Sequence, residues 1–201
     1  MFDSSNSLQQ IVAISIIALW VIFAIGFLLF KRKSKSVAKR RDPRALSGLF
    51  LQVVAMGIIW EVRRPLVSTE FELPLQLSVS VAALSLMIVS VFVTLFAVRI
   101  LGEEWTVEAQ IHKDHKLITR GPYGIVRNPI YTGIMGMMIA TGLSISEFYI
   151  ILPAIILYIV GFIIRIRSEE RLLREAFGAE FDEYCRRVPA IFPRLFNSPH
   201  H

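Results

Sequence analysis

Long uninterrupted runs of apolar residues alternate with short polar segments along the whole chain. An α-helix needs about 20 apolar residues to cross a hydrocarbon core of ~30 Å, so such runs predict membrane-spanning helices. The last two runs are short and are joined only by Ser146 and Glu147. This spacing predicts a helical hairpin and allows one or both of its helices to be tilted or incomplete spans. The five runs cover residues 9–30, about 45–60, 75–98, about 129–145 and about 148–164.

The overall composition supports the same class of protein. The chain is 54% hydrophobic and has a mean hydropathy of +0.57. We do not expect the first run to be a cleaved signal peptide, because it is long, lacks a basic segment before it and is followed by KRKSK rather than by small residues. We therefore expect an all-α integral membrane protein with about five transmembrane helices.

Basic residues predict the orientation of these helices. Only Arg63 and Arg64, among the 22 lysines and arginines, fall in the outer loops of the five-span arrangement. The positive-inside rule then places the amino terminus outside and the carboxyl terminus in the cytosol. The pI of about 9.8 does not indicate a nucleic-acid partner, because the basic excess lies in one juxtamembrane loop, where orientation and anionic lipid explain it. That loop contains Lys31, Arg32, Lys33, Lys35, Lys39, Arg40, Arg41 and Arg44.

Polar content divides the chain into two regions. Residues 1–98 hold three spans with little polar sequence between them, which predicts a membrane scaffold. Residues 99–201 alternate polar segments with the hairpin, which predicts that this region holds a site with a pocket on the cytosolic side. The single cysteine, Cys185, excludes an intrachain disulfide and a multi-cysteine metal site. His112 and His115 have no partner set for a metal, so we expect no metal.

The first polar block, HKLITRGPYGIVRNPIYTG, covers residues 115–133. Its Gly-Pro and Asn-Pro pairs are turn signals. Asn128 is predicted to cap a helix that has Pro129 at its first position, so the fourth span should begin there. Small residues along this span favour close approach between helix backbones in lipid. They are Thr132, Gly133, Gly136, Ala140 and Gly142.

The second polar block, RIRSEERLLREAFGAEFDEYCRRVPAIFP, covers residues 165–193 and is nearly balanced in charge. Its apolar spacing predicts a helix over 163–184 that continues out of the membrane, with Gly178 as a break. Arg165 and Glu169 are four residues apart and should share one face. We expect one carboxylate of the Glu169–Glu170 pair to be a solvated surface group, and we favour Glu169 as the functional one.

Taken in order, these two blocks resemble the isoprenylcysteine carboxyl methyltransferase family and its relatives among the phospholipid methyltransferases. The family pattern contains His-x-Leu-Val, Gly-Pro-Tyr and Arg-His-Pro-x-Tyr-x-Gly before a helical hairpin. Glu-Glu-x-x-Leu and Phe-Gly-x-Glu-Tyr follow the hairpin. The resemblance covers about residues 99–195. It departs from the pattern at Asn128, where the family has histidine, and at Phe181, where it has tyrosine.

The resemblance implies a membrane-embedded methyltransferase that uses S-adenosyl-L-methionine and has its active site facing the cytosol. It also implies that Arg165 is the catalytic arginine that binds the substrate. Simpler structural roles fit some of these positions: Arg127 as an interfacial arginine, and Tyr123 and especially Tyr131 as interfacial aromatic anchors. The implied cofactor-binding residues are Gln110, His115, Lys116, Leu117, Ile118, Tyr123, Arg127, Asn128, Pro129, Ile130 and Glu169.

The chemistry of methyl transfer narrows the expected acceptor. A carboxylate is already ionised at neutral pH, with a pKa near ~3.5–4.3, so no general base is needed. We therefore expect a carboxylate or similar acceptor on a lipophilic molecule that enters sideways from the bilayer, and the resemblance implies that it is an isoprenylcysteine-like carboxylate. A phospholipid amine is the alternative, and it would first have to lose a proton. Two further alternatives are a sterol-reductase-like oxidoreductase that uses NADPH and a non-catalytic membrane protein whose cytosolic segments dock a partner.

Overall fold

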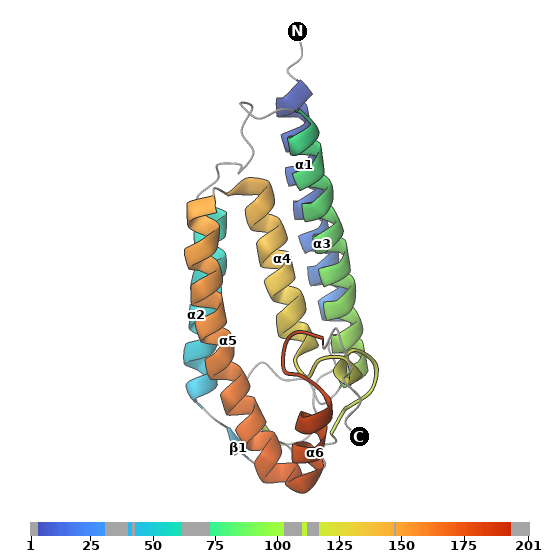
Figure 1. The fold of residues 1–201 in the computed structure, drawn as a ribbon, viewed down its shortest axis with the longest axis vertical. Coiled ribbons are helices and arrows are strands. Elements are labelled where there is room, and N and C mark those ends of the chain that lie inside the picture. The colour runs from blue at the N-terminus through green and yellow to red at the C-terminus, as the bar shows by residue number, and fades with distance from the viewer. Residues whose placement is uncertain are drawn as a thin grey trace, which may run out of the picture.

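The computed structural model describes residues 4–30, 40–41, 43–61, 73–102, 110–111, 117–146 and 148–193. Five long helices within these ranges coincide with the five apolar runs, which confirms the predicted all-α fold. Four of them are long and apolar enough to cross a membrane, whereas α4, with 17 residues, is shorter. The helices are α1 (Ser4–Phe30), α2 (Arg44–Glu61), α3 (Leu73–Leu101), α4 (Pro129–Ile145) and α5 (Phe148–Phe177) (Figure 1).

The shortest of these helices, α4, lies between two pairs of longer ones (Figure 1). α1 and α3 lie on one side of it, and α2 and α5 lie on the other. α3 packs along α4, and α2 packs along α5. A helix from residues 1–98 therefore contacts a helix from residues 99–201 on each side. The two regions therefore form a single bundle. The predicted division into a scaffold and a site-bearing region describes their roles, because the two regions are not separate in space.

Small residues explain how these helices approach one another closely. A Cβ placed on Gly161 of α5 would lie 2.5 Å from the carbonyl oxygen of Gly48 in α2. On α4, a Cβ on Gly133 would lie 2.0 Å from Oγ1 of Thr94 in α3. A β-carbon does not fit at such distances. The prediction that small residues along the fourth span permit close helix packing is thus confirmed.

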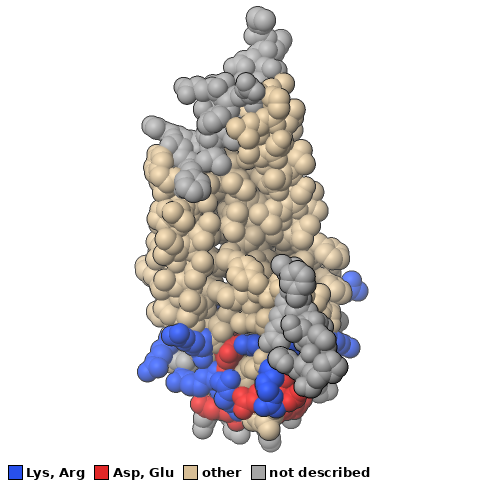
Figure 2. Space-filling model, viewed as in Figure 1, with Lys and Arg blue, Asp and Glu red and all other residues tan. Residues whose placement is uncertain are grey.

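Charged side chains gather at one end of the bundle, whereas the rest of the described surface visible in this view is uncharged (Figure 2). Two short strands, β1 (Arg40–Arg41) and β2 (Gln110–Ile111), form an antiparallel pair near this end. Arg40 pairs with Ile111, and Arg41 pairs with Gln110. The pair joins the segment that precedes α2 to the segment that follows α3. The sequence did not predict it, because two residues per strand leave no periodic signal.

The last long helix extends beyond the apolar part of the bundle. α5 has 30 residues, which corresponds to about 45 Å, whereas a bilayer core is ~30 Å thick. It ends before Gly178, whose φ of +54° lies in a region that favours glycine. A short helix, α6 (Ala179–Arg187), follows in a new direction. The predicted continuous helix with a break at Gly178 is confirmed.

Candidate functional site

A buried arginine on α5 is the centre of a polar cluster at the charged end of the bundle. The Arg165 side chain is only 4% exposed, and its Nη2 lies 3.3 Å from Oε1 of Glu169. Its Nε donates a hydrogen bond of 2.9 Å to the Tyr131 hydroxyl, which in turn donates to Glu169. The guanidinium carbon also lies 5.1 Å from the centre of the Tyr131 ring. The predicted common face of Arg165 and Glu169 is confirmed, and α4 adds a third member.

Tyr131 is fixed in this cluster by two residues of α5. The Tyr158 hydroxyl donates to the Tyr131 carbonyl at 3.1 Å, and the Phe162 ring packs against the Tyr131 ring with centres 5.5 Å apart. A buried arginine is costly unless it is paired and hydrogen-bonded, and Tyr131 and Glu169 provide those partners for Arg165. The sequence favoured an anchoring role for Tyr131. It missed the position of the hydroxyl because that position depends on how α4 packs against α5.

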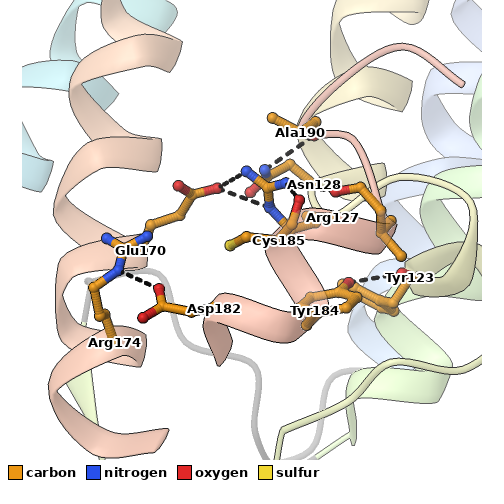
Figure 3. Close-up of polar contacts among 10 residues, drawn as sticks. Tyr123, Arg127, Asn128, Glu170, Arg174, Asp182, Tyr184, Cys185 and Ala190 are labelled. Carbon is orange, nitrogen blue, oxygen red and sulfur yellow. Dashed lines mark hydrogen bonds and ion pairs between the residues drawn. The ribbon is translucent and has the colours of Figure 1, made fainter. Parts of the chain in front are cut away.

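A second cluster connects the loop before α4 to both α5 and α6 (Figure 3). Nε and Nη2 of Arg127 donate to Oε1 of Glu170 at 3.0 and 2.7 Å. Nη1 of the same side chain donates to the carbonyl of Cys185 at 3.2 Å and to the carbonyl of Val188. The side chains of Arg127 and Glu170 are 13% and 18% exposed. The arginine is therefore part of the packed structure rather than a headgroup-reaching surface residue.

The two adjacent glutamates of α5 serve different clusters. Glu169 contacts Arg165, whereas Glu170 contacts Arg127. The expectation that one of them is a solvated surface carboxylate is wrong, because each is largely shielded and each pairs with an arginine. Successive residues on a helix point about 100° apart, so the pair can reach α4 and its preceding loop at two places.

Asn128 precedes α4 at the N-cap position, and Pro129 is the first helical residue, as predicted. The Asn128 side chain makes no capping hydrogen bond to the helix, so that part of the expectation is wrong. Its Nδ2 instead donates to the carbonyl of Ala190 at 3.0 Å, and its backbone N–H donates to the same oxygen at 3.2 Å. The amide side chain thus holds the segment after α6 rather than the first turn of α4.

Tyr123 lies in a short 3₁₀ helix, η2 (Gly121–Gly124), and is only 7% exposed. Its carbonyl accepts a hydrogen bond of 2.6 Å from the Tyr184 hydroxyl. Its own hydroxyl is buried and has no hydrogen-bond partner among the described residues. Burial raises the pKa of the Tyr123 phenol well above its usual range, and Tyr184 and Glu169 raise it further. A buried polar atom of this kind is available to a ligand.

The other predicted cofactor-binding residues lie around this loop or outside the described ranges. Leu117 packs against the cluster of Phe181 and Tyr184, and Ile118 packs against the end of α3. Pro129 and Ile130 are buried in the first turn of α4. His115 and Lys116 lie outside the described residues, and only the backbone of Gln110 is described. Within the described part of the chain, no group of three or more histidine, cysteine, aspartate or glutamate residues could hold a metal ion.

These features define a membrane-type helical bundle with buried ionic clusters at one end. Comparison with known proteins identifies the class: the phospholipid methyltransferase family matches residues 79–180, and the chain belongs to this family. The match includes both arginine–glutamate pairs, Tyr131 and η2. It ends within α6, so the segment after that helix lies beyond it.

Individual relatives carry several names. A probable protein-S-isoprenylcysteine O-methyltransferase of Oryza sativa subsp. indica is 32% identical over 123 residues, which are 57% of this chain and 61% of that protein. The cobalt-zinc-cadmium resistance protein CzcN of Cupriavidus metallidurans is 38% identical over 93 residues, or 41% of this chain and 38% of that protein. Methanethiol S-methyltransferase 2 of Bradyrhizobium diazoefficiens is 36% identical over 74 residues, or 37% and 27%. The chain thus spans less than two thirds of the length of each of these relatives.

Proposed function

We propose that this protein is a membrane-embedded methyltransferase that transfers a methyl group from S-adenosyl-L-methionine to a lipophilic acceptor. The observation that carries the proposal is the buried cluster of Arg165, Tyr131 and Glu169 at the charged end of an apolar bundle. Ionisable residues inside a membrane protein are rare and usually functional. The family to which the chain belongs supports the reaction class.

The residues around this cluster suit the proposed cofactor. Glu169 offers a carboxylate that can accept hydrogen bonds from an ammonium or from ribose hydroxyls, and the Tyr123 hydroxyl is buried without a partner. S-adenosylmethionine would supply an electrophilic methyl group on its sulfonium. We propose that the remaining contacts come from Gln110, His115, Lys116, Leu117, Ile118, Arg127, Asn128, Pro129 and Ile130.

We further propose that the acceptor is an isoprenylcysteine-like carboxylate and that Arg165 binds it. A planar guanidinium matches the geometry of a carboxylate and would hold its oxygen in line with the transferable methyl group. The acceptor is already ionised near neutral pH, so the cluster needs to orient it and exclude water rather than remove a proton. Residues 99–201 would form this catalytic region on the cytosolic side, with residues 1–98 as its membrane scaffold.

Binding of S-adenosylhomocysteine to the purified protein tests the cofactor. Isothermal titration should give a dissociation constant in the micromolar range, or about −8 kcal/mol, and NADPH titrated in parallel should give no heat. Binding of NADPH alone would favour an oxidoreductase. Absence of heat and of any thermal shift with either ligand at millimolar concentration would leave a non-catalytic membrane protein as the better description.

A methyl-transfer assay with three acceptors tests the substrate class. We expect turnover with an N-acetylated S-prenylcysteine, and little with an ethanolamine phospholipid or an alkanethiol. The rate with the carboxylate should vary little between about pH 6 and 8, because its pKa of ~3.5–4.3 lies below that range. A preference for the phospholipid, with a rate that rises with pH as the ammonium loses its proton, would replace O-methylation by N-methylation.

A further inference from the structure

The segment that follows α6 is bonded residue by residue to the start of α4. Residues 188–191, which we term the strap, present four successive carbonyls to it. Arg127 donates to the first of these carbonyls through its side chain and to the second through its backbone, at 2.8 Å. Asn128 donates twice to the third, at 3.0 and 3.2 Å. The Thr132 hydroxyl lies within 3.3 Å of the fourth and can donate to it.

The strap is also anchored by apolar contacts at both ends. Val188 is buried in one cluster with Phe181 and Tyr184, against which Leu117 packs. Ile191 packs against the core that α2, α4 and α5 share. The strap thus bridges α6 to the middle of the bundle and passes over the first turn of α4. Arg127, bonded to it, is held from the other side by Glu170 (Figure 3).

We propose that the strap is a wall of the methyl-transfer site and that Asn128 and Glu170 are positioning residues that hold the loop of residues 117–128 against it. This inference rests on the proposed function. Neither residue has to touch the acceptor in order to act, and for Asn128 this role is additional to its proposed contact with the cofactor. Asn128 would fix the backbone where the loop enters α4, and Glu170 would orient the guanidinium that binds the strap.

The geometry specifies the chemistry required at residue 128. The group that the side chain contacts is a carbonyl oxygen, which accepts and cannot donate. An N–H donor therefore fits, a hydrocarbon leaves the carbonyl without this bond, and an ionised carboxylate repels it. We expect variants of Asn128 to be impaired in the order histidine least, leucine more and aspartate most.

Glu170 has a matched control in the same part of the chain. Glu170 is 18% exposed and binds an arginine that is 13% exposed, whereas Glu183 is 47% exposed and pairs with Arg186 and Arg187 on the surface. Exposed ion pairs contribute little to stability, and buried ones that lose a partner leave an uncompensated charge. Glu170→Gln should therefore loosen the strap, and Glu183→Gln should not.

The single cysteine provides a readout that does not need activity. Cys185 is half-buried beside the strap, its carbonyl accepts from Arg127, and burial raises the pKa of its thiol. Maleimide labelling of the detergent-solubilised wild type near pH 8 should therefore be slow. Glu170→Gln and Asn128→Leu should label about tenfold faster, and Glu183→Gln should label at the wild-type rate.

Cofactor affinity and turnover are measured on the same variants. The variants Glu170→Gln, Asn128→Leu and Asn128→Asp should each weaken S-adenosylhomocysteine binding by about tenfold or more. A tenfold rise in the dissociation constant corresponds to ~1.4 kcal/mol of binding free energy. Turnover at saturating cofactor should fall less than affinity. Asn128→His should bind more tightly than either other Asn128 variant.

Three outcomes would overturn the inference: equal labelling of all variants, equal affinity of the three Asn128 variants, or a fall in saturated turnover with unchanged affinity. If one variant aggregates in detergent, the other variants still test the inference, because the Glu170 and Asn128 substitutions affect the same strap. Failure of the wild type to bind S-adenosylhomocysteine would refute the proposed function and the positioning role together. The labelling rates would still show whether Glu170 and Asn128 fasten the strap.

Discussion

Arg165 lies where the apolar part of α5 gives way to its charged end. Its guanidinium is already engaged, because Glu169 lies 3.3 Å away and the Tyr131 hydroxyl accepts from its Nε at 2.9 Å. An incoming carboxylate would join this network rather than meet an isolated charge. Glu169 and the Tyr131 hydroxyl would then keep the guanidinium oriented toward the acceptor.

Substitution of the two charged residues should separate their roles. Arg165→Ala should reduce turnover of the true acceptor more than it reduces S-adenosylhomocysteine affinity, and Glu169→Ala should do the reverse. Loss of a charge-assisted hydrogen bond should cost about 1.5–3 kcal/mol, or roughly 10- to 100-fold. Equal losses of cofactor affinity in the two variants would mean that the pair is a structural ion pair. Arg165 would then no longer be assigned to the acceptor.

At the residue scale, the sequence predicts contacts within one helix better than contacts between helices. Arg165 and Glu169 are four residues apart, so helical geometry alone places them on one face. The contact of Arg127 with Glu170 spans 43 residues and that of Tyr131 with Glu169 spans 38. No local pattern encodes which helices come together, so the structure was needed to bring Tyr131, Glu170 and the strap into the site.

The α2–α5 contact shows how an element can position the site from a distance. The Arg165 side chain lies against Gly48, where an added Cβ would come within 2.7 Å of its Cγ and 2.5 Å of the carbonyl of Gly161. A side chain larger than hydrogen at this point of α2 would therefore move α5, and with it the ionic cluster.

Gly48→Ala should lower the melting temperature and the acceptor turnover together, because overpacking costs about 1–3 kcal/mol. Gly57→Ala, in the same helix, is the matched control, since a Cβ there meets nothing within 4 Å. That control should be neutral or stabilising, as alanine is the better helix former by up to ~1 kcal/mol. Thermal unfolding in detergent and the transfer assay provide both measurements. Equal stability of the two variants would contradict the close contact.

The positions of the secondary-structure elements could be predicted from the sequence more fully than the contacts between them. Apolar runs gave the positions of all five long helices because length and hydropathy are local properties. The Asn-Pro pair gave the first residue of α4, and Gly178 gave the end of α5. The pairing of α2 with α5 was not predictable, because helices that are apolar on every side leave no unique face in the sequence.

The described residues concentrate charge at one end of the bundle, and the basic loop at residues 31–44 predicts that this end lies in the cytosol. A membrane-impermeant thiol reagent tests this orientation. Cys185 should be modified in opened cells or inverted vesicles and protected in intact cells. Ser34→Cys in a Cys185→Ser background should behave in the same way. Modification of either position in intact cells would reverse or break the five-span arrangement.

The strap follows the helical hairpin in the sequence, whereas the loop that it binds precedes the hairpin, and this order has a consequence for biosynthesis. The contacts of Arg127 and Asn128 with the strap, and of Arg127 with the carbonyl of Cys185, span 58 to 62 residues. At about 5–20 residues per second, the ribosome makes the loop several seconds before its partners exist. Both helices of the hairpin are synthesised in that interval. The site is therefore completed only after the last long helix has been made, so the newly made chain would be inserted into the bilayer before it can act as an enzyme.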